Sequence, residues 1–178
     1  MKRASVPAVL LAATLALAGC SGTGLQEGAV IDGTSYSVEE VQEAAAQINS
    51  IAAQPGDVRS VIYEAAIAPV FADAFAGSPF EVSDAELRTT LRNAGLQDEA
   101  TDLTLESARF RQYATILQSP DAAADPQMQP VIAQLQGITQ EDVNALDVQV
   151  NPRFGAWDPA NGGVVPQVPE WIAQPGTD

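Results

Sequence analysis

Residues 147–157 read DVQVNPRFGAW, and this stretch decides the fold that the sequence predicts. It begins with the alternation of a half-buried strand, because Val148 and Val150 fall on one face and Gln149 on the other. The strand ends at Pro152, whose nitrogen cannot donate to a β-ladder. Since the backbone groups of a single strand need hydrogen-bond partners, this strand must pair with another one.

The residues after the strand predict a turn. Pro152 favours an extended conformation for Asn151. Gly155 then permits a turn that brings Phe154 and Trp157, two of ten aromatic residues, close to each other. An aromatic pair at this point fits either the core or an exposed binding patch shared with Trp171, and we favour the core.

The other strong strand signal lies near the start of the chain. Ala29-Val30-Ile31 and Thr34-Ser35-Tyr36 flank Asp32-Gly33, a pair that favours the type I′ turn of a two-residue hairpin. If the late strand pairs with this hairpin, the segment between them leaves one small sheet and returns to it. The sequence therefore predicts a mainly α-helical protein, with about five or six helices and a small antiparallel sheet formed by an N-terminal hairpin and a C-terminal return strand.

Three capping boxes mark helix starts. In each, a Ser or Thr precedes an acidic residue by three positions, and apolar residues on both sides form a hydrophobic staple. The pairs are Ser37 with Glu40, Ser83 with Glu86, and Thr139 with Asp142. We expect helices over Val38–Ala53, Asp57–Ala76, the Ser83 cap to Ala94, Asp98–Gln118, Asp125 or Pro130 to Gly137, and the Thr139 cap to Leu146.

Proline and glycine mark the remaining boundaries. Pro69 inside the second helix predicts a kink or a split, because it lacks the N–H and crowds the preceding turn. Residues 121–126 are predicted to form a loop. Residues 158–178 contain several prolines and no helical or strand period, so we expect an irregular strap over the core, beyond a domain that spans residues 29–157.

The N-terminus indicates export. Lys2 and Arg3 precede an apolar run from Val6 to Leu17 that is too short to span a membrane. Leu17-Ala18-Gly19-Cys20 resembles the lipobox of bacterial lipoproteins, which implies that residues 1–19 are a signal peptide and that Cys20 carries acyl chains. Residues 20–28 are then a lipidated tether on the outer face of the cell membrane. An ordinary secretory peptide with a chance cysteine is the alternative.

Charge limits the partners of the chain. Without residues 1–19 it has six arginines, no lysine and 23 acidic residues, a net charge of −17. Nucleic acid is excluded as a partner because phosphate contacts need a basic face. The charge favours solubility, and a role in attracting basic clients is the alternative interpretation.

Little in the sequence indicates catalysis or a cofactor. Histidine is absent and the single cysteine is assigned to lipid, so imidazole and thiol chemistry are not expected. We predict no catalytic residue, no metal and no cofactor. The segment DPANGG at residues 158–163 fits a plain turn better than a weak Ca²⁺ site. For Arg153 we expect an ion pair with a buried carboxylate, in preference to a ligand contact.

The order of these motifs resembles a known family. The Asp32-Gly33 hairpin, VSDAEL at residues 82–87 and the return strand ending in Asn151-Pro152-Arg153-Phe154-Gly155 and Trp157 resemble the SurA-type chaperone N-terminal domain, as in actinobacterial lipoproteins that carry this domain alone. The resemblance implies a crevice that holds unfolded polypeptide. The parvulin-type prolyl isomerase domain of many relatives is missing, so isomerase activity is not expected.

The sequence thus predicts a lipid-anchored, extracytoplasmic chaperone-like protein that binds unfolded or exported polypeptides without catalysis. The alternative is an adaptor in the cell envelope that binds one specific protein or wall component. The candidate client-binding residues lie on the second and fourth predicted helices. They are Val61, Ile62, Val70, Phe71, Phe75, Phe110 and Tyr113.

Overall fold

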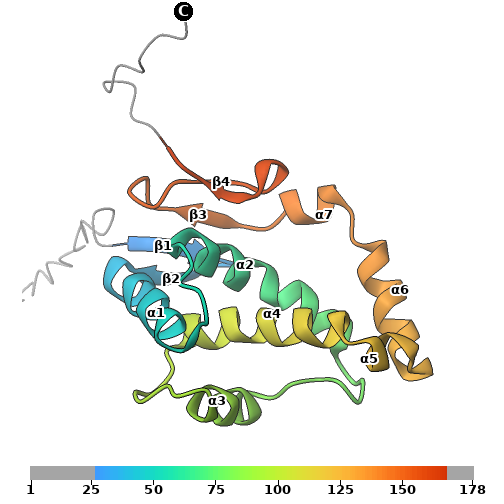
Figure 1. Cartoon of the computed structure of the whole chain (residues 1–178). Helices are drawn as coiled ribbons and strands as arrows, with labels where there is room; N and C mark the ends of the chain where they lie inside the picture. The colour runs from blue at the N-terminus through green and yellow to red at the C-terminus, as the bar shows by residue number, and fades with distance from the viewer. Residues whose placement is uncertain (1–26, 168–178) are drawn as a thin grey trace, which may run out of the picture.

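A computed structural model describes residues 27–167 as a mainly helical protein with a small antiparallel sheet (Figure 1). The predicted fold class is therefore confirmed. Cys20, Trp171, the tether up to Gln26 and the end of the strap from residue 168 lie outside the described residues. The helices are α1 (Val38–Ile51), α2 (Val58–Phe75), α3 (Asp84–Asn93), α4 (Asp102–Gln118), α5 (Pro120–Ala124), α6 (Gln129–Gly137) and α7 (Gln140–Asn144). The strands are β1 (Glu27–Ile31), β2 (Thr34–Ser37), β3 (Val148–Val150), β4 (Ala156–Asp158) and β5 (Gly163–Val165), and η2 (Pro126–Met128) and η3 (Pro159–Asn161) are short 3-10 helices.

The return strand pairs as the sequence predicts. The sheet has the order β2-β1-β3, and both ladders are antiparallel. Ile31 faces Thr34 across the hairpin and Val148 across the other ladder. Asp32 and Gly33 have φ angles of 48° and 75°, which are the positive values that a two-residue type I′ turn requires.

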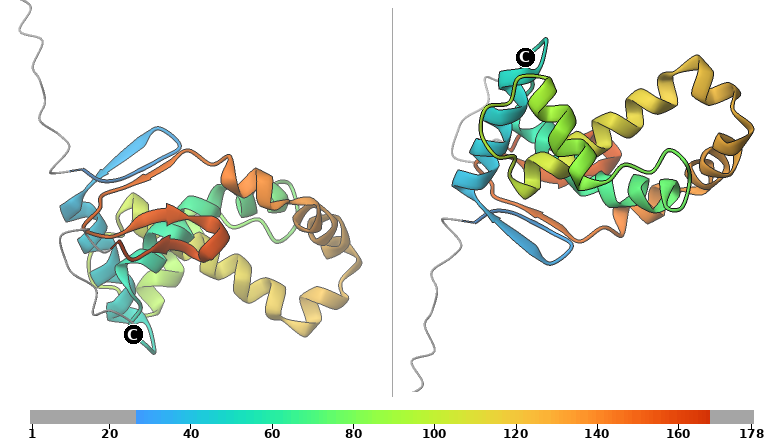
Figure 2. Two further views of the ribbon diagram at one scale, coloured as in Figure 1. Left: turned by 90° about the horizontal axis from the view of Figure 1, so that it is seen from above. Right: turned by 90° about the horizontal axis from the view of Figure 1, so that it is seen from below.

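The elements are stacked in layers (Figure 1). The β4–β5 hairpin lies on top, the three-stranded sheet and α2 lie below it, and α4 and then α3 follow. Seen from above, the hairpin crosses α2, and seen from below, α3 crosses in front of α4 (Figure 2). The α2–α4 pair forms the centre of the protein, and α5, η2 and α6 form an arm at its far end.

All three predicted capping boxes are present. In each box the Ser or Thr hydroxyl accepts a hydrogen bond from the backbone N–H three residues later, and the acidic side chain accepts from the backbone N–H of the cap. These hydrogen bonds lower the pKa values of Glu40, Glu86 and Asp142 below their usual range. The boxes satisfy N–H groups that a helix start otherwise leaves without partners.

Several predicted boundaries are wrong. The fourth helix begins at Asp102 after a Thr101 cap, four residues later than predicted. Residues 120–124 form α5 where a loop was predicted, since Pro120 is well placed at the first helical position. For Pro69 the sequence predicted a kink or a split, and the split does not occur, because one helix continues from Val58 to Phe75.

The predicted irregular strap is also partly regular. Residues 163–165 form β5, which pairs with β4, and η3 connects the two strands. The sequence did not predict these strands because Ala-Trp-Asp and Gly-Val-Val do not alternate apolar and polar residues, as the equally short β3 does. Gly162 and Gly163 have φ angles of 106° and 99°, so this hairpin depends on the conformational freedom of glycine.

The buried side chains form two clusters. The larger one, here called the sheet-side core, joins the sheet to α1, α3 and the facing parts of α2 and α4. The smaller one, here called the distal core, lies where α2 and α4 meet η2 and α6. It consists of Ala74, Phe75, Tyr113, Met128 and Val131.

Within residues 27–167, no helix has the length and apolar character needed to cross a membrane.

Candidate functional site

The Asn-Pro-Arg-Phe-Gly-x-Trp segment closes the sheet. The Asn151 amide nitrogen donates to the carbonyl of Glu27 at 2.6 Å, and its backbone N–H donates to the carbonyl of Gly28 at 2.9 Å. The Asn151 side-chain oxygen accepts from the N–H of Arg153 at 3.0 Å. One residue therefore ties the end of β3 to the start of β1 and begins the turn that follows.

The same segment packs a tight corner. Phe154 is buried in the sheet-side core, and Trp157 packs against that core from β4, which agrees with the predicted packing role. Gly155 has a φ of 135°, and a Cβ there would lie 2.2 Å from the carbonyl oxygen of Val165. These residues are thus fixed by packing and backbone geometry. We assign them a structural role.

The prediction for Arg153 is wrong. Its side chain is exposed, and its guanidinium lies 5.6 Å from the centre of the Phe154 ring. Among residues 27–167 it forms no ion pair. The turn places Arg153 on the outside, because Phe154 takes the inward position.

Most of the predicted client-binding residues belong to the core. Val61 and Ile62 are buried in the sheet-side core, and Phe75 and Tyr113 stack in the distal core with ring centres 4.1 Å apart. These four side chains therefore cannot line an open crevice, and this part of the prediction is corrected. The reason is that α2 and α4 pack directly against each other, so their facing apolar residues fill the space between them.

Val70, Phe71 and Phe110 are only partly buried. Phe71 and Phe110 meet edge to face at 5.0 Å, and Phe110 meets Tyr63 at 6.4 Å. Tyr63 in turn contacts Trp157, with the ring centres 6.0 Å apart. Phe71 and Phe110 thus join a row of aromatic rings that runs from α4 and α2 to β4.

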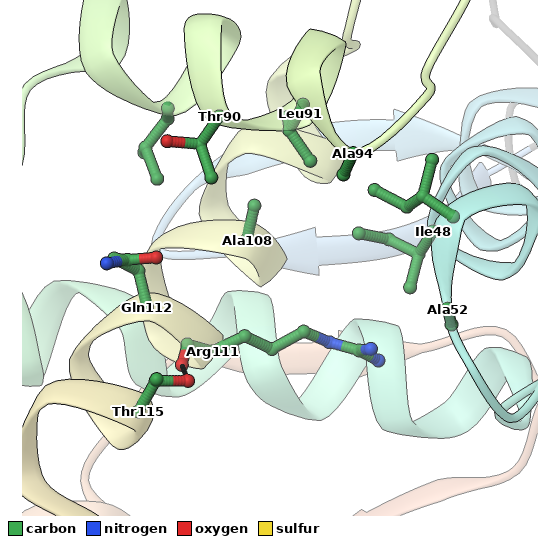
Figure 3. A pocket seen from close by; sticks show the side chains of 11 residues that line it. Ile48, Ala52, Thr90, Leu91, Ala94, Ala108, Arg111, Gln112 and Thr115 are labelled. Atoms are coloured by element: carbon green, nitrogen blue, oxygen red, sulfur yellow. Dashed lines mark hydrogen bonds between the residues drawn. The ribbon is translucent and has the colours of Figure 1, made fainter. Parts of the chain in front are cut away.

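An open pocket lies on a different side of α4, between α1, α3 and α4 (Figure 3). We call it the α3 pocket, and its volume is about 380 Å³. Leu91 and Thr90 reach into it from α3, Ile48 and Ala52 border it at the end of α1, and Ala108 forms part of its floor. Its lining is mostly aliphatic, which suits an apolar side chain.

Polar groups form one edge of this pocket. Arg111, Gln112 and Thr115 come from α4, and no Asp or Glu side chain lines it. The Nε of Arg111 donates to Glu64 at 2.8 Å, and Ser107 donates to the same carboxylate at 2.5 Å. Amide, hydroxyl and guanidinium groups beside an aliphatic floor can hydrogen-bond to a polypeptide backbone while an apolar side chain fills the pocket.

The position of α3 is fixed by a second polar contact. Arg109 donates to the Val82 carbonyl at 3.0 Å and to the carboxylate of Asp84 at 2.5 Å, and it also pairs with Glu106. Burial alone would lower the pKa of Arg109, but the hydrogen bonds to Asp84 and Glu106 raise it, so the side chain keeps its charge. The N–H of Val82 donates to the Tyr113 hydroxyl at 3.3 Å. The start of α3 is therefore held against α4.

The sequence contains the parts of this pocket but not their arrangement. Leu87 and Leu91 are apolar residues of the predicted third helix, and Ile48 is an apolar residue of the predicted first helix. Nothing in the sequence shows that their exposed neighbours Thr90 and Ala94 would border a hollow. That depends on how α3 crosses α4, which is a tertiary property.

The DPANGG segment forms a turn. Asp158 accepts hydrogen bonds from the backbone and side-chain nitrogens of Asn161, so its carboxylate caps η3. Among residues 27–167, no cluster of three or more acidic or other metal-binding side chains could hold a metal ion.

No protein-family model, no curated protein and no solved structure matches the chain.

Proposed function

We propose that this chain is a lipid-anchored, extracytoplasmic protein of chaperone type, which binds apolar segments of unfolded or newly exported polypeptides without catalysis. The observation that carries the proposal is the α3 pocket. It combines an aliphatic floor with polar groups along one edge, and about 380 Å³ is enough for one or two large side chains.

The electrostatics of the pocket support this function. The mature chain carries a net charge of −17, yet no carboxylate lines the α3 pocket. Burying an unpaired charge is costly, so a lining without acids favours apolar groups. We therefore place the proposed binding site between α1, α3 and α4. The sequence had predicted it between the second and fourth helices.

The proposed location comes from the sequence alone. Cys20 precedes the start of β1 at Glu27 by seven residues. Two acyl chains on Cys20 supply stable anchoring where one would be marginal. Metabolic labelling with a fatty acid, compared with a Cys20→Ala variant, tests the anchor; an equal label on both proteins contradicts it.

A matched pair of substitutions on α3 tests the pocket. Thr89 and Thr90 are both exposed, but only Thr90 lines the pocket. Thr90→Trp fills the pocket, while Thr89→Trp places the same side chain on the outer face. We expect the protein from Ser21 onward to slow the aggregation of an unfolded client at about equimolar ratio, and Thr90→Trp to lose most of this effect.

The Thr89→Trp control should keep the activity of the unchanged protein. If both variants protect the client equally, the pocket is not the binding site. If the unchanged protein does not slow aggregation, the chaperone function itself is wrong. Position 94 also lines the pocket and is suited to photo-cross-linking in cells. Cross-links to many different proteins support a chaperone, whereas cross-links to one dominant partner support an envelope adaptor.

A further inference from the structure

A second pocket, remote from α3, lies where α7 leads into β3. It has a volume of about 270 Å³, and we call it the acidic pocket. Its apolar walls come from the end of β1, one face of α2, the segment after α7 and the start of β3. They are Ile31, Ala66, Pro69, Val70, Ala145, Leu146 and Val148. Val70 is the one residue of the predicted client-binding set that lines it.

Three carboxylates border these apolar walls. Asp32 comes from the β1–β2 turn, Asp73 from α2 and Asp147 from the segment before β3, and all three residues are exposed. The backbone N–H of Asp32 donates to the carbonyl of Asp147 at 2.9 Å, which holds these two residues side by side. Asp73 lies one helical turn beyond Val70 on the same face of α2.

The charge of this pocket is not balanced by the protein. Within residues 27–167 the carboxylates of Asp32, Asp73 and Asp147 form no ion pair and no side-chain hydrogen bond. No arginine lines the pocket, and the chain has no lysine in this range. Arginines of α4 pair with other acids, Arg111 with Glu64 and Arg109 with Asp84.

From this arrangement we propose that the acidic pocket binds the lysine side chain of a partner polypeptide. The aliphatic stem of a lysine matches the walls formed by Val70, Leu146 and Val148, and its ammonium group reaches the acidic rim. The three carboxylates are not grouped closely enough to hold a metal ion, so they fit a long organic cation with a mobile head. This inference is independent of the α3 pocket and of the proposed function.

Binding of a short peptide to the purified protein tests the proposal. The probe is a fluorescent, end-blocked peptide with a Leu-Lys-Leu centre, and the reference peptides carry Gln or Glu in place of Lys. We expect the Lys peptide to bind about fivefold to tenfold more tightly than the Glu peptide at low salt. The difference should vanish near 1 M salt, where the screening length is about 3 Å.

Substitutions that preserve the shape of the pocket locate the site. The triple variant Asp32→Asn, Asp73→Asn and Asp147→Asn removes the charges, and asparagine tolerates the positive φ of residue 32. The control variant Glu39→Gln, Asp98→Asn and Asp121→Asn removes three charges from exposed positions that do not line the pocket. Thermal unfolding checks that both variants fold.

The pocket variant should lose the preference for lysine, and the control should keep at least about half of it. Amide chemical shifts of the unchanged protein should move at Asp32, Asp147 and Val148 on addition of the Lys peptide. The proposal is overturned if the Lys and Glu peptides bind equally at low salt, or if the shifts cluster elsewhere. A preference that falls equally in both variants shows attraction by the net charge alone, and it also overturns the proposal.

Discussion

The two ends of the α2–α4 pair are built differently. At the sheet-side core, buried polar groups cross-link separate elements. Gln47 of α1 accepts from the Thr104 hydroxyl at 2.7 Å and donates to the Glu99 carbonyl at 3.0 Å, and Glu64 accepts from Ser107. At the distal core, the contacts are mostly apolar, as in the stacked rings of Phe75 and Tyr113.

The helix starts differ in the same way. The first four helices each begin with a side-chain cap, whereas α5 and α6 have none. A part of a protein with few polar cross-links and short uncapped helices opens at lower cost than the rest. The comparison therefore predicts that the arm formed by α5, η2 and α6 exchanges its amide hydrogens before the sheet-side part does.

The largest effect is expected at the corner of the sheet-side core. Gly155→Ala places a Cβ 2.2 Å from the Val165 carbonyl oxygen, so the β4–β5 hairpin must shift. We expect a loss of about 3 kcal/mol or more in the free energy of unfolding, measured by chemical denaturation. Gly162→Ala is the control, since its φ is 106° but nothing lies within 4 Å of a Cβ there, and it should cost about 1–2 kcal/mol. Equal losses would show that strain alone, and not the close packing of the corner, sets the cost.

The distal core provides the next effect. Met128 is fully buried, and Met128→Ala leaves a cavity that costs about 2–3 kcal/mol. We expect hydrogen exchange to accelerate in α6 and the end of α4, while the amides of α1 and β1 keep their protection. If α1 loses protection to the same extent, the two cores unfold as one unit and the comparison fails.

A smaller loss of stability is expected when the polar cross-link between Thr104 and Gln47 is removed. Thr104→Val keeps the shape of the side chain but removes the hydroxyl that donates to Gln47, so the buried amide oxygen loses one of its two donors. The expected cost is about 1–2 kcal/mol by chemical denaturation. Thr115→Val on the same helix is exposed and should change stability by less than about 0.5 kcal/mol. A loss at Thr104 no greater than that at Thr115 would mean that the cross-link does not stabilise the sheet-side core.

The smallest effect concerns pH. Hydrogen bonds from Ser83 hold the pKa of Glu86 below its ordinary value of 4.5 in the folded protein. The ionised Glu86 cap therefore stabilises the folded protein fully above pH 4.5. This stabilisation is lost as the pH falls through the lowered pKa of Glu86. Glu86→Gln keeps a capping side chain without a titrating group, so its melting temperature should fall less than that of the unchanged protein on acidification.

The matched control for Glu86→Gln is Glu99→Gln, which removes an exposed carboxylate outside the capping boxes. It should follow the pH dependence of the unchanged protein. An identical acid response of all three proteins would exclude the Glu86 cap as a source of the pH dependence.

The sequence predicted the parts of the fold that depend on local chemistry. The three capping boxes, the Asp32-Gly33 turn and the strand that stops before Pro152 each depend on residues a few positions apart. The predicted start of α4 was wrong because Gln47, which is distant in the sequence, forms hydrogen bonds with the backbone of Glu99 and Thr101. These hydrogen bonds hold both residues outside the helix. Long-range contacts of this kind leave no local pattern.

The candidate site was harder to predict for a similar reason. Apolar residues such as Val61 and Phe75 are equally suited to a core and to a crevice, and only the packing of α2 on α4 distinguishes the two. The α3 pocket depends on exposed residues such as Thr90, which carry no signal of their own. The acids at positions 32, 73 and 147 border one pocket because the return strand brings segments that are distant in the sequence together.

The central position of β1 has a consequence for the order of folding. Its partner β2 is made at once, but β3 is synthesised only after nearly all the helices. Until then, one edge of β1 lacks a ladder, and closing so long a loop is entropically costly. The sheet should therefore be completed late, after the helices have begun to pack. The hydrogen bonds from Asn151 to the carbonyls of Glu27 and Gly28 should be among the last to form.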